Sequence, residues 1–65
     1  MTNTHSATHL RYVPRNTIYD VLHHNIMIKS SDDSWKLGCV YQDIASSTIY
    51  SRPYDMFAPN NWEII

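Results

Sequence analysis

Five stretches rich in apolar, β-branched and aromatic residues are separated along this chain by short polar segments, a pattern typical of strands and turns. The third stretch shows a period of two, because Leu37, Cys39 and Tyr41 occupy every second position. Five short strands with short connections predict an all-β fold, either a small barrel or a strongly curled antiparallel sheet. The predicted strands are Leu10–Val13, Thr17–Ile28, Trp35–Ile44, Thr48–Arg52 and Asn61–Ile65.

The polar segments between the strands have the chemistry of turns. Ser30–Ser34 contains only Ser and Asp, whose side chains hydrogen-bond nearby backbone groups, and Ala45–Ser47 is a second short connection. Pro53 fixes its own φ and holds the residue before it extended, so the fourth strand should end there. We then expect a turn that places the two apolar residues Met56 and Phe57 in the core.

Two positions predict irregularity within the strands. A bend is expected at His23–Asn25, in the middle of the long second strand. Gly38, the single glycine, lies mid-strand, where it would mark a bulge or a bend.

The chain has 65 residues, enough for one small domain that buries about 60% of its unfolded surface. Residues 10–65 are assigned to this domain, whereas residues 1–9 are polar and aperiodic and are interpreted as a flexible arm. Cys39 is the only cysteine, so no intramolecular disulfide can form and a reducing compartment is indicated. With no membrane span and no signal segment in the pattern, we expect a soluble cytoplasmic protein.

Charge and candidate reactive groups argue against catalysis. Five Lys and Arg against six Asp and Glu give a net charge of −1, which provides no general attraction for nucleic acid. His23 and His24 are adjacent and point to opposite faces of a strand, so a metal site is not predicted. Cys39 is interpreted as a buried small side chain, and Asp32–Asp33 as solvated turn residues. We therefore predict no catalytic residue, no metal and no cofactor.

The remaining candidate is an aromatic face that carries a cation. Tyr50 and Arg52 share one face of a strand by their two-residue spacing, and Tyr41 lies on the neighbouring strand. Such a face can anchor a peptide, stack a base or bind a phosphate. The alternative is that Arg52 braces the proline turn and Tyr50 belongs to the core. The predicted contact residues are Trp35, Tyr41, Tyr50 and Arg52, with His24 as a pH-sensitive contact at the rim.

Three segments resemble, in the same order, a family of small bacterial and phage proteins marked by YEVLG, VVYR and WVRPLEMF. They are Ile18–Leu22, Val40–Tyr41 and Ile49–Phe57, and the similarity covers about residues 16–58. The chain differs where His23 replaces a glycine and Gln42 replaces an arginine. The resemblance implies an SH3-like β-barrel and implies no activity.

These observations predict a non-catalytic binding module of bacterial or phage accessory type. It would occupy a surface of a host protein through the aromatic face, or assemble as a small homo-oligomer. The alternative function is sequestration of a small nucleotide at a homo-oligomer interface, because one such chain is too small to enclose a deep pocket. A DNA-binding role ranks last because of the charge.

Overall fold

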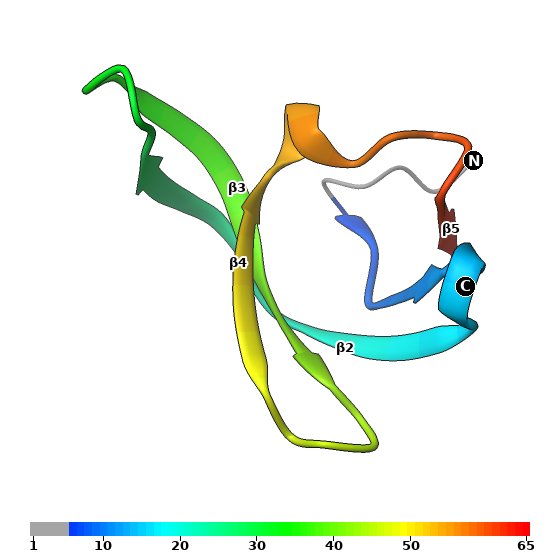
Figure 1. Ribbon diagram of the computed structural model, residues 1–65. Helices are drawn as coiled ribbons and strands as arrows, with labels where there is room; N and C mark the ends of the chain where they lie inside the picture. The colour runs from blue at the N-terminus through cyan, green and yellow to red at the C-terminus, as the bar shows by residue number, and fades with distance from the viewer. Residues whose placement is uncertain (1–5) are drawn as a thin grey trace.

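The computed structural model describes residues 6–65, which form a five-stranded antiparallel sheet in the order β4-β3-β2-β1-β5 (Figure 1). Two single-turn 3₁₀ helices, η2 and η3, directly follow β1 and β4. The predicted all-β class is therefore confirmed. The elements are β1 (His9–Tyr12), η2 (Val13–Arg15), β2 (Thr17–Lys29), β3 (Trp35–Asp43), β4 (Ile49–Pro53), η3 (Tyr54–Met56) and β5 (Trp62–Ile64).

The long strand β2 connects the two halves of the sheet. Its first residues pair with β1, up to Asp20, and from Tyr19 onward it pairs with β3. The β2–β3 ladder shifts register twice between Val21 and Ile26, and Asn25 has a positive φ of 58°. In each shift β2 advances one residue more than β3 does, so the extra residues belong to β2. This irregularity lies at the predicted bend.

Gly38 has a different role from the predicted bulge. It pairs with Ile26 of β2, directly after the second register shift, and with Pro53 of β4, and its φ is not positive. A Cβ atom at this position would collide with the backbone carbonyl of Arg52 and would lie 2.7 Å from the Cδ1 atom of Ile28. The glycine is therefore needed for close approach of the neighbouring chain segments, and the bulges lie on the facing strand.

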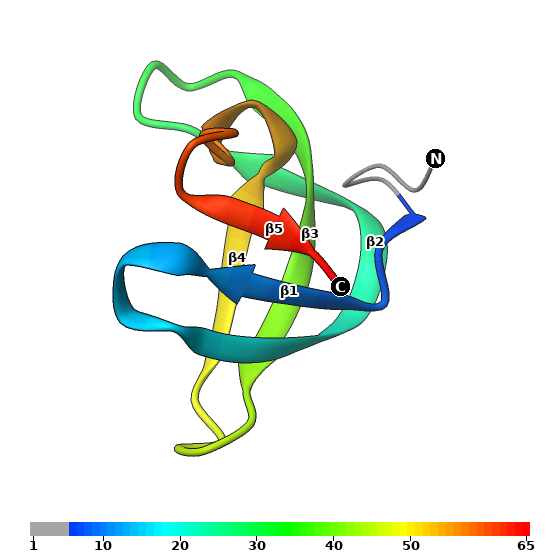
Figure 2. The same ribbon diagram turned by 90° about the vertical axis from the view of Figure 1, so that its right-hand side faces the viewer.

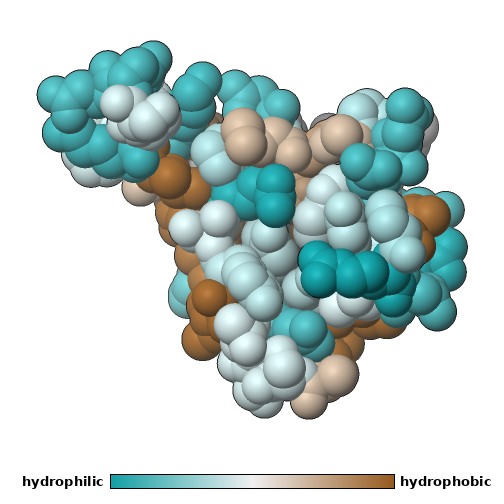
Figure 3. Space-filling view, in the orientation of Figure 1, coloured by the Kyte–Doolittle hydropathy of each residue, from teal (hydrophilic) through white to brown (hydrophobic). Residues whose placement is uncertain are grey.

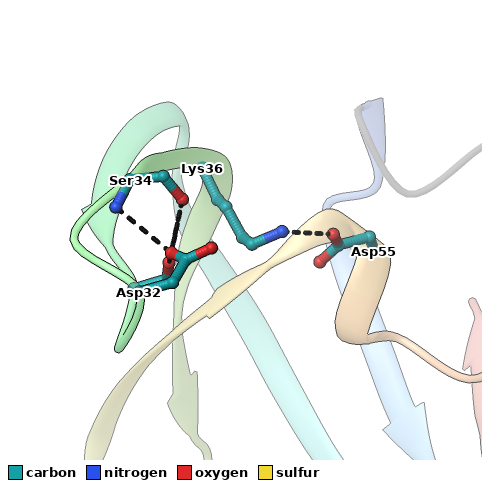
Figure 4. A network of polar contacts seen from close by, with 5 residues as sticks. Asp32, Ser34, Lys36 and Asp55 are labelled. Atoms are coloured by element: carbon teal, nitrogen blue, oxygen red, sulfur yellow. Dashed lines mark hydrogen bonds and ion pairs between the residues drawn. The ribbon is translucent and has the colours of Figure 1, made fainter.

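The turn between β2 and β3 is held by one carboxylate, as its Ser and Asp content predicted. Asp32 accepts hydrogen bonds from the hydroxyls of Ser30 and Ser34 and from the Ser34 backbone N–H (Figure 4). These hydrogen bonds hold the pKa of Asp32 well below its ordinary value. An ion pair of 3.1 Å between Lys36 and Asp55 then connects the hairpin to η3.

Phe57 enters the core and Met56 does not, so the prediction for this pair is half wrong. Phe57 is 8% exposed, whereas Met56 is 57% exposed. The 3₁₀ turn ends between them, and the extended backbone at Phe57 turns successive side chains in different directions. The buried hydrophobic residues are Ala7, Leu10, Tyr19, Cys39, Tyr41 and Phe57, which confirms Cys39 as a core residue.

The ordered sheet begins before the predicted boundary at residue 10. Strand β1 starts at His9, the carbonyl of Thr8 accepts a hydrogen bond from the Val21 N–H, and Ala7 is 1% exposed in the core. Residues 7–9 were assigned to an arm because polar neighbours hid this short segment in the sequence. Residues 1–5 of the predicted arm lie outside the described residues, and its flexibility stays a prediction.

Strands β4 and β5 form the two edges of the sheet, and no ladder joins them in the part of the chain that the structure describes. Viewed from the side, β1 and β5 cross over β3 and β4 (Figure 2). Side chains meet in this crossing, with the ring centroids of Trp62 and Tyr41 5.7 Å apart. The confirmed architecture is thus a five-stranded antiparallel sheet, and the ladder does not close it into a barrel.

Candidate functional site

Six aromatic side chains form one continuous cluster on the inner face of the sheet. Tyr41 lies at its centre because β3 is the middle partner of β2 and β4. The centroid of the Tyr41 ring is 5.0 Å from that of Tyr19 and 5.6 Å from that of Tyr50, its direct cross-strand partner. Edge-to-face and offset pairs of this kind stabilise the arrangement beyond their buried area. The aromatic cluster consists of Tyr12, Tyr19, Tyr41, Tyr50, Phe57 and Trp62.

A pocket of about 220 Å³ opens over this cluster. Its walls come from every strand of the sheet, from η2 and η3, and from the connection between η3 and β5. The face drawn in Figure 3 is mostly hydrophilic or intermediate at its centre, and hydrophobic residues gather beside the hydrophilic tip of the β2–β3 hairpin. The pocket is lined by Tyr12, Arg15, Tyr19, Tyr41, Tyr50, Arg52, Met56, Ala58, Asn61 and Trp62.

Arg52 is held in place on the β4 side of the pocket. Its Nε atom donates a hydrogen bond of 3.1 Å to the hydroxyl of Tyr41, and Nη1 donates one of 3.4 Å to the carbonyl of Met56. The guanidinium carbon lies 5.4 Å from the ring centroid of Trp62 and 5.6 Å from that of Phe57. These cation–π contacts and hydrogen bonds fix the plane of the guanidinium. Arg52 therefore both braces the turn after β4 and lines the pocket.

Arg15 lines the pocket from η2 and is less constrained. It is the last residue of η2, is exposed, and has its guanidinium carbon 5.2 Å from the ring centroid of Tyr12. Within residues 6–65 no hydrogen bond or ion pair occupies this guanidinium. Its N–H donors are available to a ligand.

The pocket is electropositive within a chain of slightly negative net charge. Two guanidiniums line it, and none of the lining side chains is a carboxylate. Burial, and next the nearby negative charge of Asp43, raise the pKa of the Tyr19 hydroxyl. Asp43 itself lies outside the lining and accepts hydrogen bonds from the N–H groups of Ala45 and Ser46.

Three of the five predicted contact residues come together in this pocket: Tyr41, Tyr50 and Arg52. Trp35 does not belong to it. It pairs with Lys29 near the tip of the β2–β3 hairpin, where it is 59% exposed and the Lys29 ammonium lies 5.5 Å from its ring centroid.

His24 lies outside the pocket as well, and its ring is engaged inside the protein. Nδ1 is 2.7 Å from the hydroxyl of Tyr54, and Nε2 is 2.7 Å from the carbonyl oxygen of Ala7. A rim contact with a partner was predicted for this side chain. The observed hydrogen bonds instead join β2 to the segment before β1 and to η3.

The residues that the sequence reasoning missed are those contributed by the ends of the chain. Tyr12 and Trp62 are direct partners in the β1–β5 ladder, which pairs residues about 50 positions apart. Arg15 follows Pro14, and a basic residue after a proline was the only local signal for it. No spacing rule connects these residues to Tyr50 and Arg52.

No group of three or more His, Cys, Asp or Glu side chains among residues 6–65 is arranged to hold a metal ion. Within the same range no helix has the length and apolar character to span a membrane.

Comparisons with known proteins found no matching family model, no matching curated protein and no matching solved structure. The resemblance to the YEVLG family stays a hypothesis that rests on the three sequence segments alone.

Proposed function

We propose that this chain is a non-catalytic binding module that holds a partner protein at the pocket over the aromatic cluster. The observation that supports this most is the composition of the pocket, which combines four Tyr, one Trp and two Arg side chains. Tyr, Trp and Arg are the residues most enriched at the energetic centres of protein interfaces. The lining offers aromatic faces, phenolic hydroxyls and guanidiniums, all groups that hold a ligand.

The size of the pocket favours a partner protein over a free small molecule. Pockets that enclose drug-sized ligands have volumes of roughly 300–1,000 Å³. The pocket here has about 220 Å³ and is open to solvent on one side. It therefore suits one or two side chains of a larger partner, whose remaining contacts would lie on the rim around Tyr50 and Met56, both of them exposed.

We propose an SH3-like barrel that is left open between β4 and β5, supported by side chains that bridge the two edges. The Arg52 guanidinium of β4 packs over the Trp62 ring of β5. The partner we propose is a host protein, and the chain itself would be a bacterial or phage accessory protein, as the resemblance implies. The single cysteine favours the cytoplasm as the compartment.

The second candidate function is binding of a small nucleotide at the interface of two copies of the chain. It is favoured by Tyr50, which is 43% exposed and stacks on Tyr41, and by the unoccupied guanidinium donors of Arg15. A base could stack on the tyrosine and a phosphate could pair with the arginine. A second copy would be required to enclose the nucleotide, because the pocket of one copy is too small.

Native mass spectrometry of the protein purified gently from the cytoplasm of its own host tests the proposal. We expect a second protein to be retained at a fixed stoichiometry by the wild-type chain. Tyr50→Ala should remove this partner, because it deletes the exposed ring of the pocket. Ile49→Ala is the matched control, since Ile49 is the adjacent exposed residue of β4 and does not line the pocket.

Retention of the same partner by Tyr50→Ala would contradict the proposal, provided that circular dichroism shows both variants folded. Arg15→Gln is a second test of the pocket. It removes one lining guanidinium and leaves the aromatic cluster intact, because Arg15 is exposed and outside the core. A mass increase of a few hundred daltons per oligomer, without a partner protein, would support the nucleotide function instead. A bare chain would contradict both.

A further inference from the structure

We infer that the pocket selects an acidic side chain, so that the partner presents a short peptide segment with an Asp or Glu next to an apolar residue. This inference rests on the proposed function and names the chemistry of the partner segment. It is carried by the charge of the lining, by the hydrogen-bond donors that remain available there, and by the aromatic surface beside them.

The charge of the pocket is opposite in sign to that of the whole chain. The lining contributes two positive charges, whereas the chain has a net charge of −1. None of the six acidic residues lies in the lining. The charge of Asp43 acts on Tyr19 from outside the lining, and its carboxylate accepts hydrogen bonds from backbone N–H groups, whereas two other acidic residues form ion pairs. Glu63 is paired with Arg11, and Asp55 with Lys36. Complementary charge of this kind determines which partner an interface accepts.

The two guanidiniums approach the pocket from different elements and have different roles. Arg52 uses Nε and Nη1 in hydrogen bonds to Tyr41 and to the Met56 carbonyl, which orients it before any ligand arrives. Arg15 makes no such hydrogen bond among residues 6–65 and packs over the Tyr12 ring, so its N–H donors are available to a ligand. A guanidinium binds a carboxylate through two parallel hydrogen bonds, so Arg15 is assigned as the carboxylate-binding residue and Arg52 as the fixed positive charge behind it.

The same charges exclude the other common ligand of an aromatic pocket. Clusters of Tyr and Trp bind methylated lysine and other cations through the negative faces of their rings. In this pocket the faces of Tyr12 and Trp62 are already covered by the guanidiniums of Arg15 and Arg52. A cationic ligand would be repelled by both. The exposed ring of Tyr50 and the side chain of Met56 remain available for an apolar neighbour of the acidic residue.

Nuclear magnetic resonance titration with two short peptides tests this inference. The probes are acetyl-Leu-Glu-Phe amide and its neutral counterpart acetyl-Leu-Gln-Phe amide, which differ in one charge at almost constant shape. We expect both peptides to shift the Tyr50 backbone and Trp62 indole resonances. The acidic peptide should bind about tenfold more tightly, the ratio expected for one charge-assisted hydrogen-bond pair at an exposed site.

Two variants with the same loss of charge separate the pocket from the general surface. Arg15→Gln should reduce the preference for the acidic peptide over the neutral one to near unity, whatever its effect on the affinity for the neutral peptide. Lys29→Gln is the control, because Lys29 lies on the β2–β3 hairpin outside the pocket. It should retain the full preference. A preference that is lost equally in both variants would overturn the assignment of Arg15.

The remaining outcomes distinguish the inference from the function on which it rests. Equal affinity for the two peptides would overturn the acidic preference and leave the pocket as a peptide site. Absence of binding by either peptide would contradict the peptide site itself, and the inference with it. Adenosine monophosphate is titrated in parallel, and tighter binding of this nucleotide to the same resonances would overturn the inference in favour of the second candidate function.

Discussion

The side chain of His24 connects three parts of the chain that are distant in sequence. The Ala7 carbonyl can only accept, so Nε2 of His24 carries a proton, and in the neutral imidazole Nδ1 then accepts the hydrogen bond from the Tyr54 hydroxyl. The same hydroxyl accepts a hydrogen bond of 3.2 Å from the backbone N–H of Asn25. The imidazole therefore fixes both the segment before β1 and η3 against the irregular part of β2.

Replacement of His24 by alanine should lower the free energy of unfolding by roughly 1–3 kcal/mol, because it leaves two polar groups without their partner. Urea unfolding followed by circular dichroism measures this change. His23→Ala is the control, since His23 is the exposed neighbour on the same strand, and a change below about 0.5 kcal/mol is expected for it. Equal losses in the two variants would show that the hydrogen bonds of His24 do not stabilise the fold.

At this scale, the sequence predicts residues whose neighbours are set by strand periodicity. Tyr50 and Arg52 share a face because they are two positions apart, and the structure places both in the pocket. Trp35 has the same periodicity as Tyr41, yet it lies at the far end of a long hairpin. Periodicity assigns a face of the strand, but how far that face continues into the core depends on which elements cover it.

The β2–β3 hairpin depends on its turn, which one carboxylate organises. Asp32 accepts three hydrogen bonds from within the turn, and the ends of the turn are joined by a hydrogen bond of 2.8 Å from the Ser30 N–H to the Ser34 carbonyl. All three of these hydrogen bonds end on Oδ1, and a charged carboxylate accepts them more strongly than the neutral acid does. Its depressed pKa therefore makes the turn sensitive to acid.

The stability that Asp32 contributes should be present at neutral pH and should decline as the pH falls below about 4. The sign follows from a pKa that is lower in the folded than in the unfolded chain, so that the unfolded chain binds the proton first. Thermal unfolding of the wild type and of Asp32→Asn between about pH 2 and pH 7 measures the effect. The variant should be less stable at neutral pH and should lose less stability on acidification.

Asp33→Asn is the matched control for this turn. Asp33 forms an exposed ion pair of 3.1 Å with Lys29, and such surface pairs contribute little to stability. Its pH profile should stay close to that of the wild type. An Asp33 variant with the flatter profile, and an Asp32 variant without it, would reverse the assignment.

Strand existence was predictable for all five strands, because apolar stretches and turn residues are local signals. Strand pairing was predictable only between neighbours in the chain. The β1–β5 ladder joins Tyr12 to Trp62, and nothing in the spacing of those residues specifies it. The irregularity of β2 lies where a bend was predicted at His23–Asn25, whereas Gly38 marks a close approach of its neighbours and not an extra residue.

At the scale of the whole molecule, Cys39 reports on opening of the core. Its side chain is fully buried, and burial raises the pKa of the thiol to about 11 from an ordinary value of 9.0. The thiol is therefore both inaccessible and protonated in the folded chain. Its reaction with a thiol reagent should require unfolding.

The reaction of Cys39 with an aromatic disulfide reagent should be about a hundredfold to several thousandfold slower in the folded than in the unfolded chain. This range corresponds to the roughly 3–5 kcal/mol that a domain of this size can reach. Absorbance of the released thiol measures the rate with and without urea. Similar rates in both conditions would contradict a buried Cys39.

The same thiol gives a stability change at alkaline pH. A pKa that is raised on folding contributes stability that is complete below about pH 9 and is lost as the pH rises toward 11. Tyr19 acts in the same direction, because its pKa is raised as well.

The pocket is formed by the fold as a whole and not by one segment of the chain. Strands from the two ends of the chain form one wall and β4 the other, so its sequence signals are spread over the entire chain.

The irregular margin of β2 has a consequence for behaviour at high concentration. The β1–β2 ladder ends at Asp20, and beyond it no described strand pairs with this edge of β2. A straight, unpaired edge of this kind would be a template for aggregation. Two bulges and the left-handed backbone at Asn25 prevent a continuous row of hydrogen-bonding groups. We therefore expect the residues that shape the hairpin also to oppose edge-to-edge pairing between chains.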